Sequence, residues 1–503
     1  MGLRATIFLA ILGACGGNNA GGDGGGGDDD GSGSAGIDAG VPAATCDRPD
    51  PVDLTGATPI GDGTAASCTQ AALQAAATVG GKLVFACGSA PVTITVTSVI
   101  TFAKETVIDG GGTVTLSGGD TTRIFYLDSD YNTATPRLTV QRLSFAHGKS
   151  PATGVDTAQG GGAIYRDGGS LTVIDSTFSN NHGPVTGQDV AGGAIYGFGG
   201  GETVIVGSVF SNNAASDGGA VGSLNADLTI LDSTFTNNQA TGTGGNPGNG
   251  GCGGALYMDG RDEKTSLCGV TIAHNTAGAI GGGFYRVSND HTGSFAMDRS
   301  TVDDNQVTPT GDGNAGGLYL EGLSLAITAS TISRNQAFYN GGMWINTCTA
   351  EITNTTIAEN TAFGSNGGGL WLGHTPTGTL KNCTIANNHS TAANQIAGAI
   401  FGDGLTLVNT VIAGNTAMYT PNCDTKRTDG SGNLQFPGSA LCTTAPTVAD
   451  PQLAPLADNG GDTETMVPAA ASPAKGLGTH CPPTDQLGHP RAEPCTAGAV
   501  EVP

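Results

Sequence analysis

Two short signatures alternate along the middle of the chain at a nearly constant spacing. The first is Gly-Gly followed by mostly apolar residues, as in residues 161–165 (Gly-Gly-Ala-Ile-Tyr) and residues 341–345 (Gly-Gly-Met-Trp-Ile). The second is Phe, Ile or Val three residues before an Asn, as at Phe178 and Asn181. From Asn181 to Asn415 its nine copies cover 234 residues in eight steps, a mean of about 29. A unit this short cannot bury its apolar positions alone, so it must stack on copies of itself.

The units are composed for strands and turns. Runs rich in Val, Ile, Thr and Leu recur, of which residues 171–178 are typical. Stacked at a strand spacing of about 4.8 Å, such runs place each apolar residue on its equivalent in the next coil. Gly and Asn accept turn dihedrals that other residues avoid, and no 3.6-residue period supports a helical repeat. The sequence therefore predicts an all-β fold, a right-handed parallel β-helix.

The segment before the repeat fits the same architecture. Strand-like runs between residues 82 and 145 add about three irregular coils, so the solenoid predicted for residues 46–420 has about 12 coils. Residues 67–77 form the one convincing helix, with Ser67 or Thr69 as its N-cap. We expect this short helix to cap the apolar end of the solenoid, which otherwise exposes unpaired strand edges.

The amino terminus predicts export. Residues 1–14 combine a positive charge at Arg4 with an apolar run too short for the roughly 20 residues that span a bilayer, as in a signal peptide. The residues Leu-Gly-Ala-Cys that end at Cys15 resemble a bacterial lipobox, which implies cleavage before Cys15 and lipid attachment to it. Residues 15–45 are rich in Gly and Asp, without Lys or Arg, and indicate a flexible linker. We expect a lipid-anchored protein of the outer membrane or cell surface.

The charge balance restricts the partners. The formal net charge is −24, from 19 Lys and Arg against 43 Asp and Glu, and there is no basic run. Phosphate backbones and anionic membrane surfaces would be repelled, so we expect no nucleic-acid partner and membrane contact through the lipid alone. Acidic polysaccharides are disfavoured as well, unless Ca²⁺ bridges them. We expect no other cofactor and no metal site, because no Cys or His cluster has zinc spacing.

The chain contains 12 cysteines, and lipidation of Cys15 leaves 11. Disulfides are expected in an exported chain. Neighbouring cysteines suggest five pairs and leave Cys46 over, although spacing does not fix connectivity. The candidate pairs are Cys68–Cys87, Cys252–Cys268, Cys348–Cys383, Cys423–Cys442 and Cys481–Cys495.

Three parts of the chain resemble known families. The opening helix and first strands resemble the start of pectate-lyase-like β-helix proteins. The two repeat signatures resemble those of chlamydial polymorphic outer-membrane adhesins. Residues 421–503 resemble the choice-of-anchor Q domain of bacterial surface β-helix proteins, through the series Asp450-Pro451, Asn459-Gly460-Gly461, Asp485-Gln486-Leu487-Gly488 and Gly498-Ala499-Val500-Glu501. This domain is expected to cap the last coil, with Asp485, Gln486 and Arg491 as a buried structural cluster.

Aromatic residues supply the candidate binding sites. One slot after Gly-Gly holds an aromatic residue in four successive coils: Tyr285, Tyr319, Trp344 and Trp371. If it faced outward, it would form a ladder for a sugar chain. We predict an inward orientation, since we align it with aliphatic residues such as Ile164. The neighbouring slot is predicted to face solvent, and with Arg166 it gives a candidate glycan-binding face of Tyr165, Tyr196, Tyr257, Arg166 and Arg286.

The sequence favours a binding protein over an enzyme. No carboxylate recurs in consecutive coils as a glycosidase or lyase site on this fold requires, and there is no Ser/His/Asp arrangement or nucleotide loop. Our main hypothesis is a surface adhesin or glycan-binding module whose partner is a polysaccharide or a host or neighbouring cell surface. A polysaccharide lyase or glycoside hydrolase is the second hypothesis, and a structural envelope protein is the third.

Overall fold

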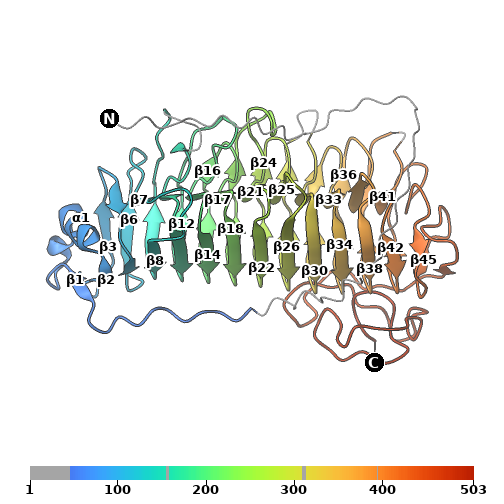
Figure 1. The fold of residues 1–503 in the computed structure, drawn as a ribbon. Helices are drawn as coiled ribbons and strands as arrows, with labels where there is room; N and C mark the ends of the chain where they lie inside the picture. Colours follow the sequence, from blue (N-terminus) through green and yellow to red (C-terminus); the bar gives the residue numbers. More distant parts are fainter. Residues whose placement is uncertain (1–45, 154–157, 309–312, 394, 503) are drawn as a thin grey trace, which may run out of the picture.

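The predicted parallel β-solenoid of about 12 coils is confirmed. The computed structural model describes residues 46–153, 158–308, 313–393 and 395–502. Its strands stack side by side along one elongated body (Figure 1). A coil passes through three main sheets in turn, which we call sheets C, A and B, and several coils add a two-residue strand of sheet D. The handedness of the coil stays a prediction.

Sheets A and B contain 14 strands each. Sheet A consists of β1 (Thr58–Ile60), β2 (Gly81–Phe85), β5 (Thr106–Asp109), β8 (Arg137–Gln141), β11 (Ser170–Ile174), β14 (Glu202–Val206), β18 (Asp227–Leu231), β22 (Lys264–Cys268), β26 (Gly293–Asp298), β30 (Leu323–Thr328), β34 (Thr349–Thr353), β38 (Thr377–Lys381), β42 (Thr406–Val408) and β44 (Thr428–Asp429). Sheet B consists of β3 (Val92–Thr95), β6 (Val114–Ser117), β9 (Ser144–Ala146), β12 (Thr177–Ser179), β15 (Val209–Ser211), β19 (Thr234–Thr236), β23 (Thr271–Ala273), β27 (Thr301–Asp303), β31 (Thr331–Ser333), β35 (Thr356–Ala358), β39 (Thr384–Ala386), β43 (Val411–Ala413), β45 (Leu434–Phe436) and β46 (Thr447–Val448).

Sheets C and D contain 11 and seven strands. Sheet C consists of β4 (Ile100–Phe102), β7 (Phe125–Asp128), β10 (Ile164–Asp167), β13 (Ile195–Phe198), β17 (Val221–Leu224), β21 (Leu256–Gly260), β25 (Phe284–Ser288), β29 (Leu318–Glu321), β33 (Met343–Asn346), β37 (Leu370–Gly373) and β41 (Ile400–Gly402). Sheet D consists of β16 (Ala214–Ala215), β20 (Gln239–Ala240), β24 (Thr276–Ala277), β28 (Gln306–Val307), β32 (Gln336–Ala337), β36 (Thr361–Ala362) and β40 (His389–Ser390).

The interior is built from rows of like residues, one residue per coil. The Phe of the second signature forms such a row, in which the rings of Phe178 and Phe210 stack with centroids 4.5 Å apart and those of Phe210 and Phe235 lie 4.7 Å apart. The recurrent Asn forms a second buried row. Asn305, for example, donates from Nδ2 to Oδ1 of Asn335 at 3.0 Å. Stacking therefore satisfies the buried amides as well as the apolar side chains.

The predicted helix is present as α1 (Gln70–Val79), preceded by a short 3₁₀ turn, Ala65–Ser67. Thr69 is its N-cap, because its side chain accepts a hydrogen bond from the Ala72 amide. The helix packs against β1 and β4 and buries Leu73 and Ala77 in the solenoid core. Its capping role stays a prediction. Within the described ranges, no helix has the length and apolar character needed to cross a membrane.

Both ends of the described chain lie along the corner between sheets A and B, at the lower edge of Figure 1. Residues 46–57, here called the strap, follow the N-terminal half of this corner. Val52 exchanges hydrogen bonds with the Gln141 amide, and Arg48 pairs with Asp175. Residues 450–502, here called the tail, cover the other half of this corner and the adjoining outer face of sheet B, where Met466 packs with Ala358 and Ala386. Arg299 lies where they approach each other, near both Cys46 and Asp462.

The tail differs from the predicted cap of the last coil. It lies against the flank of coils from Ala329 to Asn409, where Thr463 and Thr479 make its outermost hydrogen bonds to the solenoid. Residues 421–449 continue the solenoid instead, because β44 pairs with β42 and β45 pairs with β43. The tail lies sideways because its polar groups find partners in the exposed corners of several successive coils. The domain assignments for residues 1–45 lie outside the described residues.

Three of the five predicted cysteine pairs form disulfides: Cys68–Cys87, Cys423–Cys442 and Cys481–Cys495. The predicted pairs Cys252–Cys268 and Cys348–Cys383 are wrong. Cys268 bonds to Cys46, 222 residues away, and Cys252, Cys348 and Cys383 are buried outside any disulfide that the described residues form. Pairing cysteines by their closeness in sequence gave the wrong partners here, because the strap runs along the flank of the solenoid and places Cys46 near its middle.

Candidate functional site

The outer face of sheet C carries a row of aromatic side chains, here called the aromatic ladder. Strand register places Tyr165 beside Tyr196, Tyr257 beside Tyr285, and Trp344 beside Trp371. Gly222 interrupts the row between Tyr196 and Tyr257. The ladder consists of Tyr126, Tyr165, Tyr196, Tyr257, Tyr285, Tyr319, Trp344, Trp371 and Phe401.

The ladder corrects the predicted slots. Tyr285, Tyr319, Trp344 and Trp371 were predicted to face inward in a different slot from Tyr165, yet all share one outward position. The error is a shift of one residue at the glycines of residues 281–283, since Phe284 and not Tyr285 is the equivalent of the inward Leu256. Some neighbouring rings of the ladder stack nearly parallel, and others are tilted. Tyr257 and Tyr285 lie 5.4 Å apart at 4°, and Trp344 and Trp371 lie 4.6 Å apart at 6°.

Exposure varies along the ladder. Tyr196 and Tyr257 are fully buried although they point away from the solenoid interior. Loops outside sheet C cover them, and Tyr196 donates a hydrogen bond to the Asp189 carbonyl at 2.9 Å. The two ends are more open, because Tyr126 at one end and Phe401 at the other are half-buried. The prediction that Tyr165, Tyr196 and Tyr257 face solvent is therefore wrong, and only the ends of the ladder offer contact area.

An acidic side chain follows several ladder tyrosines by two residues. Because side chains alternate along a strand, the acid lies on the same outer face as the tyrosine. Tyr126 donates to Asp128 at 3.0 Å, Tyr257 lies 3.2 Å from Asp259, and Tyr319 donates to Glu321 at 2.5 Å. This Tyr-x-Asp/Glu pattern is present in the sequence but was not among the predicted site motifs. It was the available signal for Asp128 and Asp167, which follow Tyr126 and Tyr165 in the same way.

A cavity of about 730 Å³ opens at the N-terminal end of the ladder, and we call it the tyrosine cavity. Its walls combine aromatic rings, carboxylates and one arginine: Arg123, Tyr126, Asp128, Ser129, Asp130, Tyr131, Pro151, Ala158, Tyr165, Asp167 and Phe198. The hydroxyl of Tyr126 lies 3.0 Å from Asp128 and 3.5 Å from Asp167. Burial and the nearby Asp128 raise the pKa of Tyr126, so this phenol stays a neutral donor.

Arg123 forms the base of one cavity wall. Its guanidinium lies over the ring of Tyr165, with 4.6 Å from Cζ to the ring centroid. It donates to the carbonyls of Gly161, Gly160 and Ala158 at 3.1, 2.7 and 2.5 Å. Burial lowers the pKa of Arg123 to about 10, and the group stays charged at neutral pH. The arginine thus fixes the loop beside the cavity while its charge remains inside the wall.

Arg166 and Arg286, predicted for the glycan face, point into the solenoid and are fully buried. They directly follow outward-facing tyrosines, so strand alternation turns them inward. Arg166 donates to the carbonyls of Gly169 and Gly199, both at 2.8 Å. Gly197 in the next coil leaves the room that its guanidinium needs. These arginines bind backbone carbonyls where sheet C turns into sheet A, and they are unavailable to a ligand.

A buried polar network lies under the loop of residues 242–251. The hydroxyl of Tyr257 contacts Asp189 at 2.7 Å, and Asn246 donates to Asp259 at 2.8 Å. Burial raises the pKa of Asp259 to about 6, with a further contribution from the charge of Asp189. Burial also raises the pKa of Asp217 well above its usual value. The network encloses the central ladder and leaves no opening for a large ligand at Tyr257.

Other clusters are less suited to ligand binding. A second cavity of about 600 Å³, between sheets C and A, is lined by Arg137 and several acids but contains no aromatic ring. Among the described residues, the metal-ligating cluster is Cys46, Cys268 and Asp298. Its two sulfurs are joined in a disulfide, so only one carboxylate remains as a ligand.

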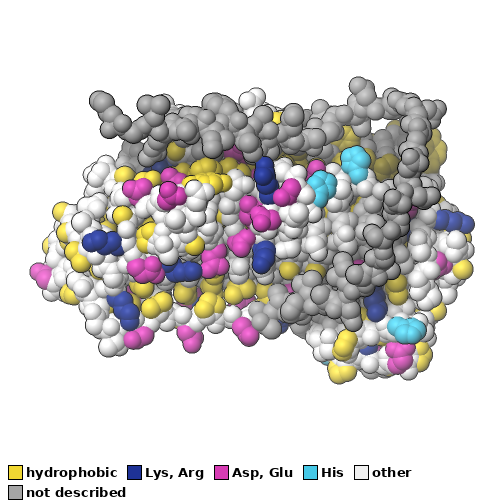
Figure 2. All heavy atoms as spheres, viewed as in Figure 1, with side chains coloured by type: hydrophobic (Ala, Val, Ile, Leu, Met, Phe, Trp, Pro, Cys, Tyr) yellow, Lys and Arg dark blue, Asp and Glu magenta, His cyan; other side chains and the backbone are white. Residues whose placement is uncertain are grey.

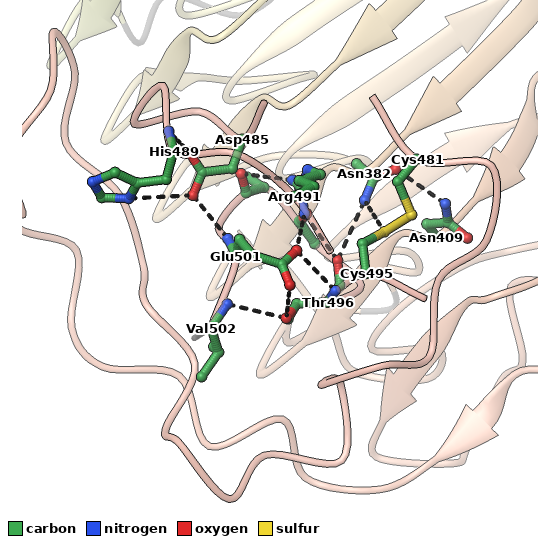
Figure 3. Close-up of polar contacts among 12 residues, drawn as sticks. Asn382, Asn409, Cys481, Asp485, His489, Arg491, Cys495, Thr496, Glu501 and Val502 are labelled. Carbon is green, nitrogen blue, oxygen red and sulfur yellow. Dashed lines mark hydrogen bonds and ion pairs between the residues drawn. A yellow bond between two sulfur atoms is a disulfide. The ribbon is translucent and has the colours of Figure 1, made fainter. Parts of the chain in front are cut away.

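The tail contains a buried polar cluster that fastens it to the solenoid (Figure 3). Arg491 bonds to Glu501 at 3.2 Å and to Asn354 of the solenoid at 2.9 Å. Asp485 accepts hydrogen bonds from the amides of Leu487, His489 and Glu501. Gln486 reaches Thr331 and Thr356. The structural interpretation of Asp485, Gln486 and Arg491 is therefore confirmed.

Comparison with known proteins adds only distant likenesses. No protein-family model and no curated protein matches the chain. Among solved structures, the A-module of the Azotobacter vinelandii mannuronan C-5 epimerase AlgE4 is 16% identical, covering 73% of this chain and 97% of its own, with a TM-score of 0.34. PfbA, a surface adhesin of Streptococcus pneumoniae, is 12% identical, covering 82% and 100%, with a TM-score of 0.32. The fold assignment rests on the strand pairing of the chain itself.

Proposed function

We propose that this protein is an exported β-helix protein, held at the cell surface through a lipid on Cys15, that binds a glycan in the tyrosine cavity. The observation that carries the proposal is the composition of that cavity. Tyr126 and Tyr131 offer ring faces for the apolar faces of a sugar, and Asp128 and Asp167 offer acceptors for its hydroxyls. Sugar-binding sites need this combination of flat apolar surface and fixed polar groups.

The position of the strap supports surface display. The disulfide of Cys46 with Cys268 holds the end of the linker half-way along the solenoid, not at one end. It lies at the corner of sheets A and B, which is the corner that sheet C does not share. A lipid anchor before this point would tether the solenoid through the flexible linker from its flank, opposite sheet C. The disulfides themselves fit an oxidising compartment.

The proposal is tested with a glycan array and a titration of its best oligosaccharide. We expect Tyr131→Ala, which removes a ring that is 37% exposed, to weaken binding at least tenfold. Tyr126→Ala should act similarly. Tyr419→Ala, at an exposed tyrosine near the other end of the solenoid, is the matched control and should leave the affinity unchanged. An array without any bound glycan, or equal losses in all three variants, would contradict the proposal.

One observation favours the alternative of a glycoside hydrolase. Asp128 and Asp167 are partners on adjacent strands, and both lie within 3.5 Å of one phenol, an arrangement suited to paired acid and base carboxylates. Hydrolysis would release new reducing ends from a bound oligosaccharide. Asp167→Asn should abolish that release while the oligosaccharide still binds. Binding with no new reducing ends over prolonged incubation would exclude this alternative.

A further inference from the structure

The charge of the tyrosine cavity is unbalanced. Asp128, Asp130 and Asp167 line it, while Arg123 is the one basic residue of its wall. The guanidinium of Arg123 is already hydrogen-bonded to three backbone carbonyls. It therefore cannot turn toward a ligand without breaking these bonds. The three carboxylates and the one guanidinium give the cavity wall a net charge of −2.

The aromatic walls act in the same direction as the carboxylates. Ring faces attract cations through their negative quadrupole, and the attraction grows when water is excluded. The wall already holds one cation in this way, because Arg123 lies 4.6 Å over the ring of Tyr165. The phenol of Tyr126 stays neutral and donates to Asp128 and Asp167, so it leaves the negative charge of the two carboxylates in place. The ring faces and the carboxylates of the wall both favour a cation over an anion.

We infer that the tyrosine cavity selects a glycan that carries a free, protonated amine, such as a polymer of deacetylated hexosamine. This inference rests on the proposed glycan binding and specifies its substrate class. The ammonium group would lie between Asp128 and Asp167 and near the ring of Tyr126, while the sugar rings contact Tyr131. N-acetylation removes the charge and lengthens the substituent. A uronic acid would place a carboxylate against three others.

The test is a calorimetric titration of the full chain with three probes. These are a β-1,4-linked glucosamine pentamer, its fully N-acetylated counterpart and an oligogalacturonate of equal length. The titrations are run at a mildly acidic pH that keeps the amine protonated. We expect the glucosamine pentamer to bind at least tenfold more tightly than the acetylated one, with an affinity that falls as NaCl is raised. The oligogalacturonate should not bind, with or without Ca²⁺.

Two variants locate the selectivity. Asp128→Asn and Asp167→Asn should each reduce the preference for the amine while the acetylated pentamer binds as before. Asp403→Asn, at an exposed carboxylate just after β41 at the other end of sheet C, is the matched control and should keep the full preference. The readout is the ratio of the affinities for the two pentamers, so a smaller fraction of active protein does not change it.

Each outcome decides between the two proposals. Equal affinities for the free and acetylated pentamers overturn the amine selectivity and leave glycan binding standing. Tight binding of oligogalacturonate in Ca²⁺ also overturns the selectivity, since it shows that the carboxylates bridge to acidic sugars through the metal. Absence of binding to any glycan, on the array or here, overturns both. A tenfold preference that Asp128→Asn and Asp167→Asn reduce supports both.

Discussion

At the scale of single residues, equivalent aspartates of sheet C differ in exposure between its open end and its closed middle part. Asp128 is exposed at the edge of the tyrosine cavity, whereas Asp259, which follows Tyr257 as Asp128 follows Tyr126, is buried at 8% exposure. Three donors reach Asp259, from Asn246, Tyr257 and Asn289. They do not offset the loss of water, since burial still raises its pKa to about 6.

Replacing Asp259 with Asn should therefore change stability in a pH-dependent way. The carboxyl binds its proton more tightly in the folded chain, so the stability that it contributes is lost as the pH rises from about 4 to about 6. We expect the melting temperature of Asp259→Asn relative to wild type to be more favourable at neutral pH than at pH 4. The difference should correspond to about 1–3 kcal/mol. Asp403→Asn controls for the lost charge, and a pH-independent difference would contradict this account.

At the scale of an element, the buried Asn row links each coil to the next. Asn305 accepts from both the backbone amide and Nδ2 of Asn275, at 3.0 and 2.9 Å. It also donates to the Ile272 carbonyl and to Asn335. One side chain thus holds three coils in register, and its loss leaves buried partners on either side unsatisfied.

Asn305→Ala should destabilise the protein by about 2–4 kcal/mol, because buried partners lose their hydrogen bonds without gaining water. Gln306→Ala changes the next residue, which is exposed, and should cost less than about 0.5 kcal/mol. Chemical denaturation followed by circular dichroism measures both. Equal effects of the two substitutions would show that the Asn row does not hold the coils together.

The elements also show what the sequence could and could not predict. The nine repeats of Phe, Ile or Val before Asn predict the stacking, because each residue type recurs where its equivalent lies. The predicted register of sheet C is wrong from residues 281–283 onward. Three consecutive glycines there allow the Gly-Gly motif to be aligned in two ways. The burial of Tyr196 and Tyr257 was not predictable, because the loops that cover them do not follow the repeated sequence of the coils. Cys46 found Cys268 through the path of the strap, which no local pattern encodes.

At the scale of the whole molecule, the two chain ends together cover the corner between sheets A and B. Under the strap, Ile174, Val206 and Leu231 form an apolar row against which Cys46 packs. Beyond Arg299 the tail covers this corner and the adjoining outer face of sheet B, through polar contacts such as the pair of Arg334 and Glu464 at 2.6 Å and apolar contacts such as Met466 with Ala358. This corner is therefore occupied by the chain itself, whereas the tyrosine cavity lies on sheet C, away from the strap and the tail.

Cys46→Ser should release the strap without unfolding the solenoid. The disulfide is the one covalent link between the strap and the coil of Cys268, while β1 and the sheets keep their own pairing. Hydrogen exchange measured by mass spectrometry should lose protection in residues 46–57 and keep it in sheets A to C. Cys481→Ser, which opens a disulfide within the tail, should leave the strap protected. An unchanged strap in Cys46→Ser would show that Arg48 and Val52 suffice to hold it.

A crystal structure of the protein with an oligosaccharide that it binds shows whether the N-terminal end of the aromatic ladder is the binding site. We expect a sugar ring against Tyr126 and Tyr131, with a polar group of the sugar between Asp128 and Asp167. An oligosaccharide seen only over sheets A and B, with the tyrosine cavity filled by water, would contradict this expectation.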